Sequence, residues 1–465
     1  METAFAVDRI PRRTWTILAV VSICSVLNPL SQSILNLAFP SLQAAFPESS
    51  AATLSWVLSL YAIVSAATLI VGGVIGDRIG HKRVLIVGTA GYVVASIVCG
   101  LAPNVAVLLA ARAGQALGSA LITPAGAALV LREFPPSRRG TAIAAWAAAG
   151  SVATAIGPTL GALLVDVGGW EWAFWISVPF GCIGLVLVPR LVTEIPREDV
   201  DLPDLMSVPL IIASVSGVIL GVSQSGRWGW ADTRTISSIV GGLIIGLYVV
   251  VRSARHRRPL LDLTMFRFRS FRIANFSSLV FGTTFFALFF AFPRFTQDVW
   301  GYDVRAAGLL FLPIPIAGVL LNGSAGRFAD IHGQRRVMVM GGFFQFVGGV
   351  VFVVGIGDSR NVLLWLIGLG FVGLGSSLIW PAIFGNAVIG LPPQRFGAAM
   401  SINQTLQRVA TAGGAALQIS LIGEVSGPRV GHYERIFVLT AMGGVLAMII
   451  GLFMSGVRER DPRPG

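Results

Sequence analysis

Long apolar runs separated by short charged loops dominate this sequence of 465 residues. Each run can cross a bilayer as one helix, because a membrane helix needs about 20 apolar residues. Hydrophobic residues make up 54% of the chain and charged residues only 12%, and no soluble fold could bury that much apolar surface. The sequence therefore predicts an all-α integral membrane protein.

Fourteen membrane helices are predicted from the positions of these runs. They lie near residues 15–37, 52–76, 84–102, 105–131, 140–165, 171–190, 205–224, 235–252, 273–296, 306–326, 337–356, 361–389, 397–423 and 435–456. We expect a six-helix bundle over 1–190, a linker with two extra membrane helices and a basic cytoplasmic loop over 191–272, and a second six-helix bundle over 273–465.

The net charge of +12 could suggest nucleic-acid binding, but the basic residues lie between the apolar runs, where they set topology. Lys and Arg concentrate in the loops on the side of the N-terminus, so we expect both termini in the cytoplasm. Arginine is strongly preferred over lysine, which is typical of GC-rich bacterial genomes and indicates a bacterial inner membrane. The expected partners are the lipid bilayer, a small-molecule substrate and protons, with no nucleic acid, and we expect a monomer.

The sequence gives no sign of catalysis. The three cysteines fall within apolar runs, and no hydrolase, phosphate-loop or metal-ligand pattern is found. We therefore expect no disulfide, no metal, no cofactor and no enzymatic activity.

A short motif occurs once in each six-helix group. Its first copy ends the second run and its second copy occupies the equivalent place in the other half. The residues are Gly73, Asp77, Arg78, Gly80, Lys82 and Arg83 in the first copy, and Gly326, Asp330, Gly333, Arg335 and Arg336 in the second. Two copies predict two related halves, and the alignment of Val152 to Ala155 with Val409 to Ala412 supports this.

Most of this motif can be explained by topology, but its acid cannot. A tight connection between two membrane helices needs small residues at the crossing, a turn glycine and basic residues on the cytoplasmic side. Asp77 needs another partner, either Arg78 or the positive N-terminal end of a helix in the other half. We favour the helix end, because Ile331 replaces the arginine after Asp330.

Together these features resemble the major facilitator superfamily, in its fourteen-helix drug:proton antiporter branch. Four further stretches carry the resemblance: Arg112 and Gln115 in the fourth helix, Gly150, Gly157, Pro158 and Gly161 in the fifth, Trp170 to Pro179 before the sixth, and Pro259 to Asn275 before the ninth. The resemblance implies two six-helix bundles plus two inserted helices, and export of drugs or metabolites by alternating access with proton antiport. It assigns gating to the repeated motif, leak-tight packing to the fifth helix, and proton coupling or charge sensing to Arg112, Gln115 and Arg408.

Two departures leave alternatives open. Ser31 stands where the branch usually has an acid, and no Asp, Glu or His falls near the centre of a predicted helix. Proton-coupled transporters generally need such a group, whereas arginine does not readily release a proton. The usual arginine of the thirteenth helix is Gln407 here, followed by Arg408. The alternatives are an uncoupled carrier, an anion carrier that uses Arg112 and Arg408, a lipid flippase, and a sensor that does not transport.

Five polar or aromatic residues are predicted to line a central substrate cavity: Asn36, Trp56, Tyr61, Asn403 and Gln404. Gln407, Trp146 and Trp380 are further candidates. An aromatic and amide lining suits amphipathic drugs, although amides also link membrane helices to one another.

Overall fold

The computed structural model describes residues 10–49, 51–135, 138–194, 204, 206–256, 259, 262–302, 304–392, 395–422 and 431–454. Within these ranges the chain is helical and contains no strand. The helices of the first half are α1 (Arg12–Ser25), α2 (Leu27–Ala45), α3 (Ala51–Ile79), α4 (His81–Gly100), α5 (Val105–Glu133), α6 (Arg139–Gly168), α7 (Trp172–Trp175) and α8 (Ser177–Leu191). Two further helices follow, α9 (Ser207–Trp228) and α10 (Thr233–Arg255).

The second half opens with a short 3-10 helix, η2 (Leu263–Arg267). Its longer helices are α11 (Arg269–Asp298), α12 (Val304–Phe311), α13 (Pro313–His332), α14 (Gln334–Gly355), α15 (Val362–Val388), α16 (Phe396–Ile422) and α17 (Gly431–Leu452). All fourteen predicted segments are helical, and eleven helical stretches of the described chain are long and apolar enough to cross a membrane. The predicted all-α membrane fold is confirmed.

Three segments predicted as single helices, 15–37, 171–190 and 306–326, are each built from two consecutive pieces. Proline explains the breaks, because it lacks a backbone N–H and leaves the carbonyl four residues earlier without a helical partner. The first pieces end at Ser25, Trp175 and Phe311, each four positions before a proline: Pro29, Pro179 and Pro315.

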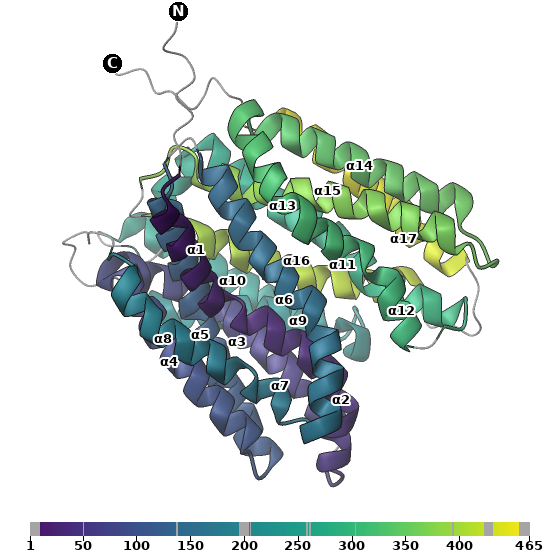
Figure 1. Ribbon diagram of the computed structural model, residues 1–465, viewed down its shortest axis with the longest axis horizontal. Helices are drawn as coiled ribbons and strands as arrows, with labels where there is room; N and C mark the ends of the chain where they lie inside the picture. The colour runs from purple at the N-terminus through teal and green to yellow at the C-terminus, as the bar shows by residue number, and fades with distance from the viewer. Residues whose placement is uncertain are drawn as a thin grey trace, which may run out of the picture.

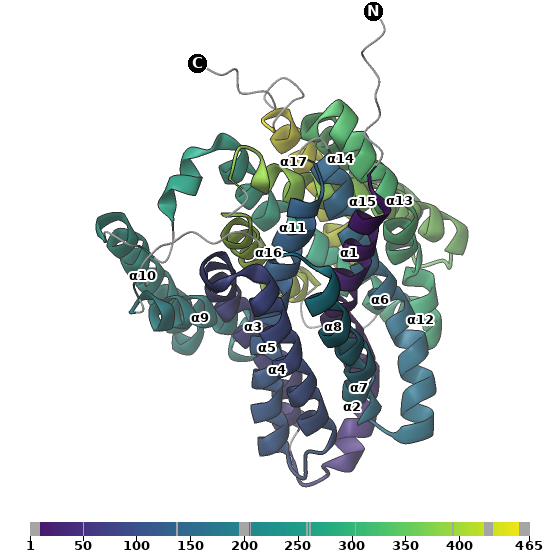
Figure 2. The same ribbon diagram turned by 60° about the vertical axis from the view of Figure 1, so that its left-hand side comes forward.

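The two halves form two helical bundles that lie side by side (Figure 1). In the first half α4 packs on α5, and in the second half α14 packs on α15 and α17. Contacts between the halves come mainly from α3 against α16 and from α6 against α13. The pair α9 and α10 lies on the outside of the molecule beside α3, as Figure 2 shows.

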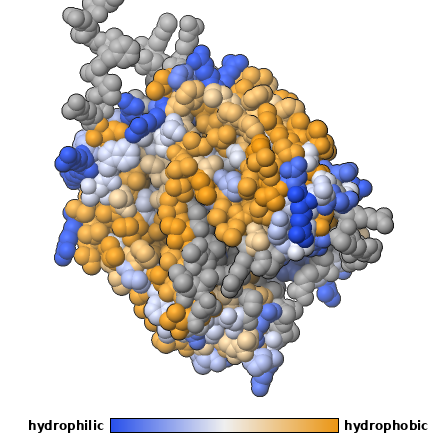
Figure 3. Space-filling model, turned by 45° about the vertical axis from the view of Figure 1, so that its right-hand side comes forward, coloured by the Kyte–Doolittle hydropathy of each residue, from blue (hydrophilic) through white to orange (hydrophobic). Residues whose placement is uncertain are grey.

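The outer surface is apolar over most of the face seen in Figure 3, and blue hydrophilic side chains gather toward its edges. Large exposed side chains such as Val167, Leu320 and Val354 contribute to this surface, with 88%, 71% and 81% of their area exposed. Lipid tails would cover such a surface, so it is expected for a protein that spans a bilayer.

The first and the last described residues lie at one end of the molecule. Arg13 donates to Thr193 at the end of the first half, and Gly451 of α17 packs on Met338 of α14. The repeated motif joins the two halves at this same end. A chain that crosses the membrane an even number of times has its first and last residues on the same side.

Candidate functional site

The first copy of the motif joins α3 to the start of α16 in the other half. Asp77 lies in the last turn of α3, and one of its carboxylate oxygens accepts a hydrogen bond from the backbone N–H of Ala398 at 3.0 Å. Ala398 is in the first turn of α16, where the helix dipole favours a negative charge. The other carboxylate oxygen lies 2.9 Å from Nε2 of the buried His81. The helix-end partner favoured from the sequence is therefore present.

The second copy makes the equivalent contact with the start of α6. The carboxylate of Asp330 accepts hydrogen bonds from the backbone N–H groups of Gly140 and Thr141, both at 2.8 Å. It also accepts from the Thr141 hydroxyl at 2.6 Å. Each half thus places an acid on the N-terminal end of a helix in the other half.

Glycines allow the close crossings beside these acids. A Cβ added at Gly326 would lie 2.4 Å from the carbonyl oxygen of Gly140, and one at Gly73 would lie 2.7 Å from that of Gly397. Aligning Val152 to Ala155 with Val409 to Ala412 places Gly140 opposite Gly397 in the repeat. Motif glycines therefore face equivalent glycines at both crossings, and we name the two crossings together the paired gate.

The turns after the acids follow the sequence prediction. Gly80 and Gly333 have φ angles of 111° and 84°, which side chains with a Cβ rarely adopt. After Gly80, the carboxylate of Glu194 accepts hydrogen bonds from the backbone N–H groups of Lys82 and Arg83 at 2.9 and 3.2 Å. Glu194 therefore caps α4, a role that we did not predict because it lies far from the motif in the sequence. Arg335 and Arg336 are exposed at the start of α14.

A central cavity of about 580 Å³ lies between the halves. Its lining from the second half is strongly aromatic, with Phe285, Phe286, Phe289, Phe311, Trp380 and Phe384. The first half contributes Ser25, Asn28, Thr123, Trp146, Ala147 and Gly150, of which the first three are polar. The aromatic rings contact one another, for example Phe289 with Phe311 at a centroid distance of 5.0 Å. The cavity can thus hold an aromatic molecule between an aromatic wall and a partly polar one.

Arg408 is the only charged side chain among the described residues that line this cavity. It is half-buried, and no described acid forms an ion pair with it. Gln404 and Gln407 lie on the same helix and add amide groups to the lining. The described lining is therefore positively charged.

Arg112 lies outside the cavity in a buried cluster of the first half, and none of its surface is exposed. Its guanidinium donates to the carbonyl of Val57 at 3.0 Å, to Oε1 of Gln115 at 2.8 Å and to Oε1 of Gln32 at 3.2 Å. It also stacks over the ring of Tyr61 at 4.3 Å. Neutral oxygens and an aromatic face stabilise this charge.

A chain of contacts links Arg112 to the cavity wall. The hydroxyl of Tyr61 donates to Asn28 at 2.6 Å, and Asn28 lines the cavity. Ser31, where the resembling branch has an acid, is buried and donates to the carbonyl of Ala173. Its neighbour Gln32 supplies the oxygen that faces Arg112. Gln32 was not among the predicted site residues, although it lies next to Ser31 in the sequence.

The other predicted residues are spread over three settings. Gln404 lines the cavity, whereas Asn403 is buried between Ser278 and Asn275, which it contacts at 3.0 and 3.2 Å. Trp56 packs in a small apolar cluster with Ile219 of α9.

In α6, Gly150 borders the cavity and Gly157 is buried. The helix continues without a break through Pro158 and Gly161. The surroundings of these two residues, and the side chain of Asn36, lie outside what the structure describes.

Comparison with known proteins identifies the family. The family model of the Major Facilitator Superfamily matches residues 21–415. Multidrug resistance protein Stp of Mycobacterium tuberculosis is 31% identical over 426 residues, which cover 90% of this chain and 78% of that protein. The tetracenomycin C resistance and export protein of Streptomyces glaucescens is 27% identical over 424 residues, 90% of this chain and 77% of its own length.

Solved structures support the fold independently. The human organic anion transporter MFSD10 superposes with a TM-score of 0.69 at 16% identity, covering 95% of this chain and all of its own. A variant of the xylose transporter XylE gives the same TM-score at 14% identity, covering 96% and 97%. With a family match over most of its length and the same helical architecture, this multi-pass membrane protein belongs to the Major Facilitator Superfamily of transporters.

Proposed function

We propose that this chain is a member of the fourteen-helix drug antiporter branch that exports aromatic, amphipathic small molecules by alternating access. The observation that carries the proposal is the aromatic cavity between two halves that are locked together at one end by the paired gate. Such a cavity opens to one side at a time when the halves rock about it. The resistance and export proteins among the relatives support the same class of substrate.

We further propose that the substrates carry an anionic or neutral polar group. Arg408 would hold an anionic group by charge-assisted hydrogen bonds, which are stronger than neutral ones. A cation would meet no acid among the described lining residues. The positively charged lining therefore favours the anion-carrier alternative over a conventional exporter of cationic drugs.

Proton coupling needs a titrating group, and we assign it to the gate. Asp77 holds α16 through its negative charge and lies against His81, so protonation of the carboxylate would weaken its bond to Ala398. Proton binding and opening of the gate would then be linked. Asp77, at one end of the molecule, would then take the coupling role that an acid at the position of Ser31 has in the resembling branch.

Purified protein in liposomes would test these proposals. A fluorescent naphthalene sulfonate and a naphthyl ammonium of similar size serve as probes, and a lumenal pH dye reports proton movement. We expect the sulfonate to move with counter-movement of protons, and Arg408→Gln to raise its KM about tenfold. Arg360→Gln, an exposed arginine outside the cavity lining, is the matched control.

Three outcomes would contradict the proposals separately. If neither probe moves, export of aromatic compounds is wrong. If the ammonium probe is preferred and Arg408→Gln has no effect, the anionic substrate class is wrong. If Asp77→Asn keeps full proton movement with each turnover, coupling through the gate is wrong.

A further inference from the structure

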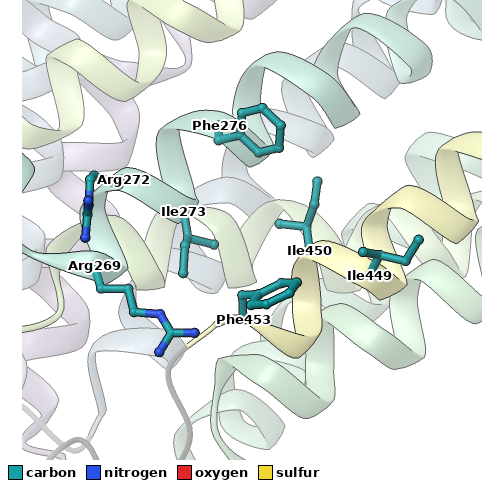
Figure 4. A pocket seen from close by; sticks show the side chains of 7 residues that line it. All are labelled: Arg269, Arg272, Ile273, Phe276, Ile449, Ile450 and Phe453. Atoms are coloured by element: carbon teal, nitrogen blue, oxygen red, sulfur yellow. The ribbon is translucent and has the colours of Figure 1, made fainter.

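A second cavity, of about 450 Å³, lies away from the central one (Figure 4). It is formed by the beginning of α11 and the end of α17, at the end of the molecule that holds the paired gate. Both helices belong to the second half. Most of its lining residues are exposed, so the cavity opens to the outside of the molecule.

Two arginines form its polar side. Arg269 and Arg272 are exposed residues in the first turn of α11, and Figure 4 shows their guanidinium groups beside the apolar side chains of the cavity. No described residue accepts a hydrogen bond or forms an ion pair with either guanidinium. Both guanidinium groups are therefore available to an external anion, which the helix N-terminus also favours.

The rest of the cavity is apolar and open to the bilayer. Phe276 and Phe453 expose 58% and 54% of their area, while Ile450 is buried and forms the floor. In Figure 4 the rings of Phe276 and Phe453 lie on the same side of the arginines. Topology alone requires basic residues at this level, but it does not require an apolar cavity beside them.

We propose that this cavity binds one anionic phospholipid. The phosphate lies between Arg269 and Arg272, and an acyl chain follows Ile450, Phe276 and Phe453. Basic pockets between membrane helices on the cytoplasmic side bind such head groups, whereas a free phosphate would leave the apolar part of the cavity without a partner.

The position of the site connects it to the paired gate. The Ser270 hydroxyl, between the two arginines in sequence, donates to the carbonyl of Ile389 at 2.9 Å. Arg395 donates to Thr264 of η2 at 2.9 Å, and Arg395 directly precedes α16. A lipid that holds the start of α11 thereby also steadies the segment that presents Ala398 to Asp77.

Lipid titration of the purified full chain in detergent would test the proposal, with binding counted by native mass spectrometry. Dioleoyl phosphatidylglycerol is the probe, and dioleoyl phosphatidylcholine and inorganic phosphate are the comparison ligands. We expect phosphatidylglycerol to bind in preference to phosphatidylcholine. We also expect Arg269→Gln with Arg272→Gln to weaken its binding about 30-fold, or about fivefold for each arginine.

A matched control removes two exposed arginines at the same end of the molecule but outside the cavity, by Arg255→Gln with Arg267→Gln. This variant should bind phosphatidylglycerol nearly as the wild type does. Equal loss in both double variants would overturn the site, because it would show only a general effect of charge. Equal binding of the two lipids by the wild type, or displacement of the lipid by millimolar phosphate, would also overturn it.

Discussion

The two crossings of the paired gate share one design but differ in their partners. Asp330 meets two backbone N–H groups and the Thr141 hydroxyl at the start of α6. Asp77 meets the backbone N–H of Ala398 and the ring of His81. At the repeat position of Thr141 the second half has Ala398, so the hydroxyl is lost on that side.

This difference indicates that the two crossings have separate tasks. Asp330 is held by two backbone N–H groups and a hydroxyl, so its crossing would part less readily. Asp77 accepts from the backbone N–H of Ala398, where the second half has no hydroxyl, so its crossing would part more readily. The two halves thus make similar contacts that differ at single residues of the repeat.

The largest effect is expected from valine at the motif glycines. In Gly326→Val the new Cβ would overlap the carbonyl of Gly140, so α6 and α13 must separate. Overpacking of this size lowers the population of the closed gate by about 5- to 150-fold, and Gly73→Val should act similarly.

Spin labels on cysteines at Ile79 and Ile331, in a background without native cysteines, would report the separation of the halves at this end. The control is Gly323→Val, on the same helix as Gly326, where a Cβ meets no atom within 4 Å. An unchanged label distance in Gly326→Val would show that the close crossing is not needed.

Neutralising each acid in turn should have different effects at the two crossings. In Asp330→Asn an amide NH₂ must face backbone N–H groups, which leaves at least one donor unsatisfied at a cost of about 1–3 kcal/mol. In Asp77→Asn the amide oxygen can still accept from Ala398 while the NH₂ faces His81, so the loss should be smaller. The distance between the spin labels at positions 79 and 331 measures the opening in each variant. A larger opening in Asp77→Asn than in Asp330→Asn would contradict the proposed division of tasks.

Removing one hydroxyl tests the difference directly. Thr141→Ala deletes one hydrogen bond to Asp330. We expect this to destabilise the closed state of the gate by about 1 kcal/mol, which lowers the ratio of closed to open protein about fivefold. Thr141→Ser keeps the hydroxyl and should behave as the wild type. The reciprocal change, Ala398→Ser, should stabilise the closed state at the Asp77 crossing. No response to either change, measured by the same labels, would mean that the hydroxyl is not what distinguishes the crossings.

The smallest effect is expected where the two helix starts touch each other. The guanidinium of Arg139 lies 4.7 Å from the ring of Phe396, and these residues occupy equivalent positions of the repeat. Arg139→Gln removes a cation–π contact of about 0.5–1 kcal/mol. Phe396→Leu removes the same contact and should change the distance between the spin labels by a similar amount. A much larger opening in Phe396→Leu alone would show that packing, and not the charge, stabilises this contact.

The sequence predicted the repeated parts of the molecule well. All fourteen helical segments, the turn glycines and the helix-end partner of Asp77 follow from local signals: apolar length, the φ freedom of glycine, and a charge without a topological reason. The breaks after Ser25, Trp175 and Phe311 precede prolines, but helices α5, α6, α11 and α15 continue through theirs, so proline alone does not predict where a helix breaks.

Contacts between residues far apart in the chain could not be predicted in this way. Nothing near Glu194 shows that it caps α4, and nothing near Asn28 shows that it meets Tyr61. The assignment of Tyr61 to the cavity rested on its aromatic character, which does not distinguish a buried ring under Arg112 from a ring that faces a substrate. Periodicity defines the face of a helix, but only packing decides what that face meets.

The extra pair of helices makes the two sides of the molecule mechanically unequal. Ile219 of α9 is buried against Ile63 and Ala66 of α3, with Val409 and Ala412 of α16 packed against the same cluster. If α3 parts from α16, α9 must lose its contacts with one of the two helices. The pair α9 and α10 thus adds, through α9, apolar contacts at the crossing that has no equivalent of the Thr141 hydroxyl.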